Sequence, residues 1–151
     1  MKTPRLTAQA RTRLDERFRE MGPVSRFAPP VHGWIKAIRE ALGMSTAQLA
    51  RRLRVAQPTV VAAELSEEKG TIQLATLRRA ADALDCKLVY ALVPNRSLEE
   101  TIRDRARLFL RRRREPVEHS MMLEDQNVAR KDTDALVHQV LQETSPRHFW
   151  D

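Results

Sequence analysis

The chain has 151 residues, of which 42% are hydrophobic, 31% are charged and 5% are aromatic. This length suits one ordinary domain, or one small domain with helical extensions. The longest apolar runs, such as Leu88–Val93, are too short to cross a bilayer, and residues 1–18 lack the apolar core of a secretory signal. We therefore expect a cytoplasmic protein that does not associate with membranes.

The formal net charge is +7, and nearly all of the excess comes from arginine. Arginine keeps its charge at any cellular pH and donates in a fork that suits phosphate, which favours a polyanionic partner. The alternative is a surface that is merely well solvated. Cys86 has no second cysteine to pair with, so we interpret it as a core residue in a reducing compartment. No cysteine or histidine cluster has metal-ligand spacing, and we expect no cofactor.

The N-terminal segment, residues 1–33, is predicted to be one amphipathic helix followed by a linker. Apolar residues recur at helical spacing over residues 4–21. These are Leu6, Ala10, Leu14, Phe18 and Met21. Three prolines and two glycines in residues 22–33 exclude a regular helix there.

The middle segment, residues 34–94, contains two short helices joined by a tight turn. A helix over residues 34–42, with Trp34 facing inward, ends at Gly43, and Ser45 caps the next helix over residues 46–53. The four residues "RVAQ" then leave room only for a turn before a helix over residues 57–65, whose first turn tolerates Pro58. This pattern is typical of a helix-turn-helix, whose second helix can enter the major groove of DNA. A loop over residues 66–72 and a helix over residues 74–84 are expected to follow.

The stretch after residue 85 predicts a β-strand, because β-favouring residues alternate and Pro94 ends the run. A lone strand needs a backbone partner, and no second strand is visible in the sequence. We expect Leu88, Tyr90 and Leu92 to pair with the same strand of a second copy across a two-fold axis, giving a homodimer. The alternative is pairing with another segment of the same chain.

The C-terminal segment, residues 95–151, predicts two more helices and a tail. Ser97 caps the first helix, which begins with acidic residues and ends with Arg111–Arg114, matching the helix macrodipole. Those arginines either bind phosphates or are simply solvated. The last helix is expected near residues 122–143. Phe149 and Trp150 in the tail either dock on the protein itself or bind a partner.

Residues 34–92 resemble a lambda-repressor-like (Xre-type) helix-turn-helix domain, through "IREALGMSTAQLARRLRVAQPTVVAAEL" and the following "TIQLATLRRAADALDCKLVYALVP". The whole chain resembles a narrower family, mobile mystery protein A, through "GTIQLATLRRAADALDCKLVYALVPNRSLEE" and the terminal "FWD". Members of that family are found in mobile elements beside a partner with a Fic domain. The resemblance implies the antitoxin and repressor half of a toxin–antitoxin pair, with a Fic-domain toxin as its partner.

The resemblance also implies roles for individual residues. Gln57 matches a glutamine that opens the recognition helix in many relatives and can read adenine, although it could equally be an exposed residue that supports the helix start. Thr46 is expected to contact phosphate, Thr59 to contact phosphate or a base edge, and Val61 to touch a thymine methyl group. Where Val61 and Ala62 stand, many relatives have polar or arginine side chains. The candidate contacts to the DNA backbone are Arg51, Arg52 and Arg54.

Two further residues fit a pattern that restrains Fic enzymes, in which a serine or threonine is followed four positions later by glutamate. Ser120 and Glu124 match this spacing, but Asp125 stands where the pattern has glycine or asparagine. The alternative is an ordinary helix N-cap. Ser120, Glu124, Phe149 and Trp150 are therefore candidate partner-binding residues.

Taken together, these features predict an all-α fold: a lambda-repressor-like helix-turn-helix domain with one dimerising β-strand and helical extensions at both ends. The expected function is sequence-specific binding of double-stranded DNA at an inverted repeat, as a homodimeric transcriptional repressor and antitoxin. The alternative is a protein-interaction adaptor whose helix-turn-helix does not read DNA. We do not expect an enzyme, because no Asp, Glu and His residues cluster in the sequence.

Overall fold

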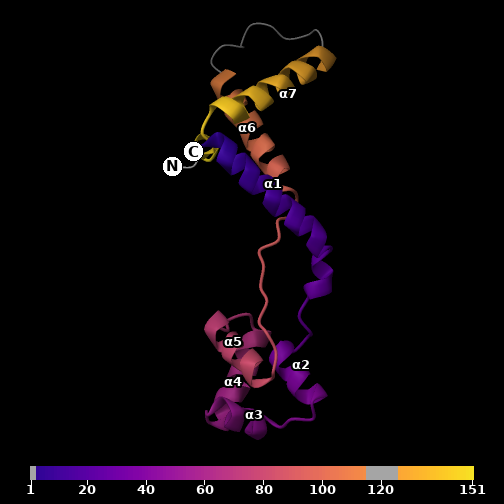
Figure 1. The fold of residues 1–151 in the computed structure, drawn as a ribbon, viewed down its shortest axis with the longest axis vertical. Helices are drawn as coiled ribbons and strands as arrows, with labels where there is room; N and C mark the ends of the chain where they lie inside the picture. The colour runs from indigo at the N-terminus through magenta and orange to yellow at the C-terminus, as the bar shows by residue number, and fades with distance from the viewer. Residues whose placement is uncertain (1–2, 115–125) are drawn as a thin grey trace. The chain divides into compact units, whose positions relative to one another are not determined.

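The computed structural model describes residues 3–114 and 126–151, and the regular secondary structure of these residues is entirely helical (Figure 1). The predicted all-α class is thus confirmed for this part of the chain. The helices, two of which are short 3₁₀ helices (η), are α1 (Pro4–Met21), η1 (Val24–Phe27), α2 (Trp34–Ala41), α3 (Thr46–Leu53), α4 (Gln57–Glu68), α5 (Leu74–Ala83), α6 (Leu98–Arg114), α7 (Gln126–Glu143) and η2 (Pro146–Phe149).

The chain forms two compact units. One unit comprises residues 23–92 and contains η1 and α2 to α5. The other joins the N-terminal residues as far as Gly22 with those from Val93 onward, and contains α1, α6, α7 and η2. The two ends of the chain, predicted as separate extensions, therefore pack together in one unit.

The prediction of a dimerising β-strand after residue 85 is wrong. Residues 86–93 have no regular secondary structure, and no strand occurs anywhere in residues 3–114 and 126–151. Leu88 is half-buried, whereas the side chains of Tyr90 and Leu92 are 65% and 91% exposed. The β-favouring residues form a segment without helix, but a strand also requires a second backbone to bond with, and the described part of this chain supplies none.

The core of the unit formed by residues 23–92 lies where α2 to α5 meet. Leu49 of α3 and Val60 of α4 are the two side chains buried most completely. The other buried apolar residues of this core are Ile35, Ala50, Ala80 and Leu84. Trp34 was expected to face inward but is 46% exposed. It is the first residue of α2, and Ile35 and Ile38, further along, supply the apolar contacts of this helix with the core.

Most helices in this unit begin and end where local signals in the sequence predict. Gly43 has a positive φ of 65°, and Ser45 forms a capping box with Gln48, in which each side chain bonds to the other residue's backbone N–H. Helix α4 begins at Gln57 as predicted, but it continues to Glu68 through three residues expected in a loop. The side chain of Glu67 accepts hydrogen bonds from the backbone of α2, a long-range contact that holds this last turn in place.

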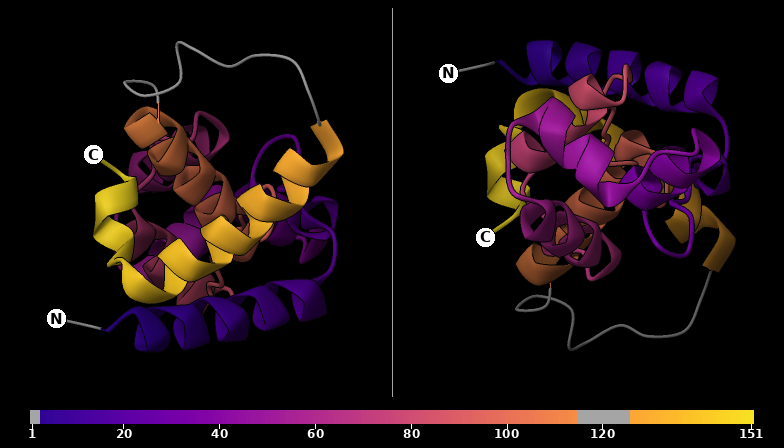
Figure 2. Two further views of the ribbon diagram at one scale, coloured as in Figure 1. Left: turned by 90° about the horizontal axis from the view of Figure 1, so that it is seen from above. Right: turned by 90° about the horizontal axis from the view of Figure 1, so that it is seen from below.

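The other unit is built around α6. Helix α7 lies across α6, and α1 runs beside both (Figure 2). Its core contains Ile102 and Ala106 of α6, Val137 of α7, and Phe149 of η2. The predicted last helix is described from Gln126 onward, and residues 122–125 lie outside the described residues.

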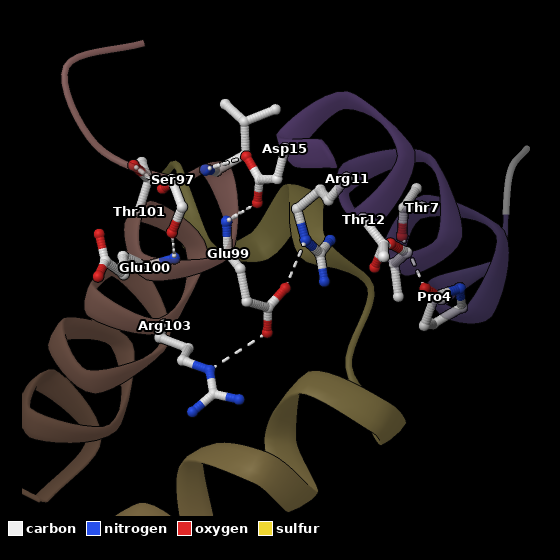
Figure 3. Close-up of polar contacts among 12 residues, drawn as sticks. Pro4, Thr7, Arg11, Thr12, Asp15, Ser97, Glu99, Glu100, Thr101 and Arg103 are labelled. Atoms are coloured by element: carbon white, nitrogen blue, oxygen red, sulfur yellow. Dashed lines mark hydrogen bonds and ion pairs between the residues drawn. The ribbon is translucent and has the colours of Figure 1, made fainter. Parts of the chain in front are cut away.

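Helix α1 faces this unit with polar side chains rather than with its predicted apolar stripe. The carboxylate of Asp15 is buried and accepts hydrogen bonds from the backbone N–H groups of Leu98 and Glu99, at 2.8 and 3.1 Å (Figure 3). Arg11 bonds to the side chain of Glu99 at 3.2 Å (Figure 3). Ser97 caps the N–H of Glu100, as predicted. Of the predicted stripe, Leu6 and Leu14 remain exposed and Ala10, Phe18 and Met21 are half-buried. None of the five belongs to the apolar core of this unit, so the contact that seats α1 is the capping of α6.

Replacing Asp15 with alanine is expected to destabilise this unit by about 1–2 kcal/mol, because two backbone donors at the start of α6 lose their acceptor. Hydrogen exchange at the amides of Leu98 and Glu99 should accelerate by about tenfold. The control is Glu16→Ala, which changes the exposed neighbour of Asp15 and should leave both rates within about twofold. Equal exchange rates in the two variants would show that Asp15 does not hold α6.

Candidate nucleic-acid interface

The turn between α3 and α4 consists of residues 54–56. Arg54 adopts a left-handed conformation with φ 57°, and the N–H of Val55 bonds back to the carbonyl of Ala50 at 3.0 Å. The side chain of Val55 packs on the core beneath the turn. The geometry is therefore that of two short helices held at a fixed angle by a buried core, as the sequence predicted.

Two carboxylates hold the inner face of α4. Glu64 is buried and accepts bonds from Nε and Nη2 of Arg39 in α2, at 2.5 and 3.2 Å. Arg39 also donates to the backbone oxygen of Met44 at 2.9 Å. The Glu64 carboxylate raises the pKa of Arg39 above its ordinary value through these bonds, so the pair stays charged. Glu64 is thus a structural anchor between α2 and α4.

Glu67 is the second of these carboxylates. It accepts the backbone N–H groups of Trp34 and Ile35 at 2.8 and 2.9 Å, and so caps the start of α2. Gly33 allows this approach: its φ is 84°, and a Cβ atom there would lie 2.7 Å from the Glu67 side chain. Because Val60, Glu64 and Glu67 occupy the inner face of α4, the opposite face is left to the solvent.

The outward face of α4 carries the three residues of this helix that were predicted to contact DNA. Gln57, Thr59 and Val61 are all exposed, and Val61 is 49% exposed. Ala62 is exposed beside them. Two of these four exposed residues, Val61 and Ala62, are apolar, which suits contact with thymine methyl groups but offers few hydrogen bonds to bases.

Two predicted DNA-contacting residues, Gln57 and Thr46, are brought together by the fold. The side-chain nitrogen of Gln57 donates to the hydroxyl of Thr46 at 2.8 Å. An amide nitrogen has two hydrogens, so one donor and the carbonyl acceptor of Gln57 remain available to a base. The hydroxyl hydrogen of Thr46 also remains available, for example to a phosphate. This bond orients the amide before any ligand arrives.

The predicted arginines fall into two groups. Arg51 and Arg54 are exposed, and within the described parts of the chain neither has an ion-pair partner. Arg52 donates from Nε to the backbone oxygen of Ala83 at 2.7 Å, and so satisfies a carbonyl at the end of α5, a role that the sequence did not reveal. The chain contains no acidic residue between Glu40 and Glu64, so nothing in α3 or the first half of α4 opposes these positive charges.

Sequence reasoning missed Arg79 of α5. Its side chain lines a shallow depression together with Thr59 of α4 and Thr76, over a floor of core residues that includes Leu49 and Val60. The helical spacing of Leu77, Ala80 and Leu84 would have placed Arg78 and Arg79 on the outer face, and this signal could have identified them. Arg79, a cation from a third helix, thus lines the same depression as Thr59.

The four candidate partner-binding residues lie in different surroundings. Ser120 and Glu124 lie outside the described residues. Phe149 is buried, with its ring edge-on to that of Phe109 and the ring centres 5.3 Å apart. It docks on its own chain, which is one of the two alternatives that the sequence left open for this residue. Trp150 remains 54% exposed beneath the guanidinium group of Arg105.

Two features of the described residues bear on the class of site. Within residues 3–114 and 126–151, no helix is both long and apolar enough to span a membrane. In the same residues, no group of three or more His, Cys, Asp or Glu side chains is arranged to hold a metal ion.

Comparison with known proteins agrees with this geometry. Residues 35–90 match the helix-turn-helix family model, and the match covers α2 to α5. No curated protein and no solved structure shows a significant match to the chain. The matched region contains the turn at residues 54–56, the inner-face carboxylates of α4 and its exposed outer face. Residues 35–90 are therefore a helix-turn-helix domain of the Xre-like type.

Proposed function

We propose that this protein is a sequence-specific DNA-binding transcriptional regulator that acts as a repressor. The observation that carries the proposal is the orientation of Gln57 by Thr46 on the exposed face of α4. A second helix presented outward by a rigid core is the element that enters the major groove in helix-turn-helix proteins. The family match and the absence of carboxylates between Glu40 and Glu64 support the same conclusion.

The proposal includes a homodimer bound to an inverted repeat. Two copies related by a two-fold axis would place their α4 helices about one DNA turn apart, so the two half-sites should be centred about 10 base pairs from each other. The exposed apolar residues Val89, Tyr90 and Leu92, all in one short run, offer surface for such an association. Binding to DNA, without catalysis, is the activity proposed.

The proposal is tested by selecting sites from a randomised duplex library with the full chain. The selected duplex should bind at least tenfold more tightly than a scrambled duplex at moderate salt, and its sequence should be an inverted repeat. Sedimentation of the complex should give two chains per duplex. No preference for the selected over the scrambled sequence would reject sequence-specific binding.

The alternative function is that of an interaction adaptor that does not read DNA. The specific observation that favours it is the apolar outer face of α4 at Val61 and Ala62. The same selection distinguishes the two functions, because an adaptor enriches no sequence from the library.

An antitoxin role beside a Fic-domain toxin is a finer proposal that rests on the resemblance to mobile mystery protein A. Of the four residues considered for partner binding, only Trp150 is both described and exposed. A neighbouring reading frame with the motif "HPFxxGNGR", and co-purification of its product with this chain, would be the expected results. A chain that neither binds nor inhibits that product would contradict this role.

A further inference from the structure

Three residues of α4 lie four positions apart and form one row along the helix: Gln57, Val61 and Leu65. Residues at this spacing share one side of a helix, so the row is about 12 Å long. All three side chains are exposed, that of Val61 by 49% and that of Leu65 by 48%. The row therefore begins with an amide, which Thr46 orients, and continues with two apolar side chains.

The apolar part of this row has no group that can form a hydrogen bond. Ala62, which is exposed beside Val61, adds none, and Leu65 is not among the DNA contacts that the sequence predicted. Base pairs facing these side chains are therefore distinguished by their apolar groups rather than by their donors and acceptors. In the major groove, the apolar group that a standard base presents is the methyl group on C5 of thymine.

Duplex DNA fits this row better than a protein partner does, for two reasons. The row is continuous with Gln57, the residue proposed to read adenine. Its surroundings are also positive, because Arg51 of α3 and Arg54 of the turn are exposed and the chain has no acidic residue between Glu40 and Glu64. A helix that reaches the bases lies between two lines of phosphates, so positive surroundings suit DNA.

We propose that Val61 and Leu65 contact the C5 methyl groups of two pyrimidines in each half-site, so that α4 reads 5-methylpyrimidines. The inference rests on the proposed function. The two residues are about 6 Å apart along α4, which places the two pyrimidines about two base pairs apart.

The proposal has a consequence for modified DNA. Thymine and 5-methylcytosine carry the same methyl group on C5 and differ in the hydrogen-bonding group on C4, which an apolar side chain does not read. Methylation of cytosine on C5 therefore substitutes for thymine at the two positions that Val61 and Leu65 contact. Binding at a site with cytosine there depends on the methylation state of the DNA.

The first test uses the unmodified full chain and changes only the selected duplex. Deoxyuridine lacks the methyl group of thymine and keeps the same donors and acceptors. At two positions of the half-site, deoxyuridine in place of thymine should weaken binding about fourfold, the factor expected for one buried methyl group. With cytosine at those positions, methylation on C5 should strengthen binding by about the same factor. A selected duplex in which no thymine responds to deoxyuridine would overturn the inference.

The second test assigns each methyl group to a residue. Leu65→Ala should lose the response to deoxyuridine at one position and keep it at the other, which belongs to Val61. The matched control is Leu74→Ala, which truncates a leucine that is 45% exposed at the start of α5 and should keep both responses. If Leu65→Ala also keeps both responses, Leu65 contacts no methyl group and the inference fails.

Failure of this inference differs from failure of the proposed function. A duplex that is selected from the library but does not respond to its methyl groups rejects only the reading by Val61 and Leu65, and leaves the apolar row to a protein partner. A library that yields no preferred duplex rejects sequence-specific binding by α4, and the inference with it.

Discussion

Replacing Arg39 with methionine should destabilise the helix-turn-helix domain by about 3–5 kcal/mol, a large fraction of the stability of an ordinary domain. The substitution leaves the Glu64 carboxylate buried without its cation, and it removes the donor to the backbone oxygen of Met44. A buried charge without a partner costs far more than the pair contributes when intact. Because Glu64 lies on α4 and Arg39 on α2, the loss also releases α4 from α2.

Urea unfolding measures this effect directly. Trp34 is the only tryptophan of residues 23–92, so its fluorescence reports on this unit in a Trp150→Phe background. The matched control is Arg51→Met, an exposed arginine whose replacement should change the stability by less than about 0.5 kcal/mol. A double replacement, Arg39→Met with Glu64→Leu, should recover part of the loss, because it removes both charges. Similar midpoints for Arg39→Met and Arg51→Met would show that the pair is not a structural anchor.

Replacing Gln57 with alanine should cost about 1–3 kcal/mol of discrimination at one base pair in each half-site, which is a factor of roughly 5–150 in relative affinity. Affinity for scrambled duplexes should hardly change, because the contacts with phosphate remain. Thr46→Val should produce a smaller loss at the same base pair, since it keeps the amide but removes the hydroxyl that orients it. Competition with duplexes changed at single positions measures both effects.

The control for this series is Gln73→Ala, which removes an exposed glutamine at the start of α5. It should leave the preference at every position unchanged. If Gln57→Ala also leaves all preferences unchanged, Gln57 is only an exposed residue at the start of the helix. An effect of Thr46→Val on base preference without an effect of Gln57→Ala would instead assign the base contact to Thr46.

The sequence predicts those parts of the fold that depend on neighbouring residues. The helix at residues 4–21, the cap at Ser45, the turn after Leu53 and the start of α4 at Gln57 all follow from local spacing and capping. Features that depend on distant residues are missed. The last turn of α4 is held by the bond of Glu67 to α2, and α1 is seated by Asp15 rather than by its apolar stripe.

The same distinction applies to the site. The resemblance points to Gln57, Thr59 and Val61, and the structure leaves all three exposed, because buried Val60 and Glu64 fix the inner face of α4. It cannot reveal that Gln57 bonds to Thr46, or that Arg52 binds the end of α5, since each contact joins two helices. The strand at residues 86–93 fails for a related reason, because propensity alone does not supply the partner that a strand requires.

The claim that α4 reads DNA is tested most directly by replacing a single nitrogen atom of the DNA, N7 of adenine, with a C–H group. Adenine offers N7 as an acceptor and its amino group as a donor, which match the remaining donor and acceptor of Gln57. In the selected site, replacing one adenine per half-site with 7-deazaadenine should weaken binding of the unmodified protein, and should have no effect on Gln57→Ala. Equal sensitivity of the two proteins at every adenine, or no sensitivity in either, would contradict the reading of DNA by this residue.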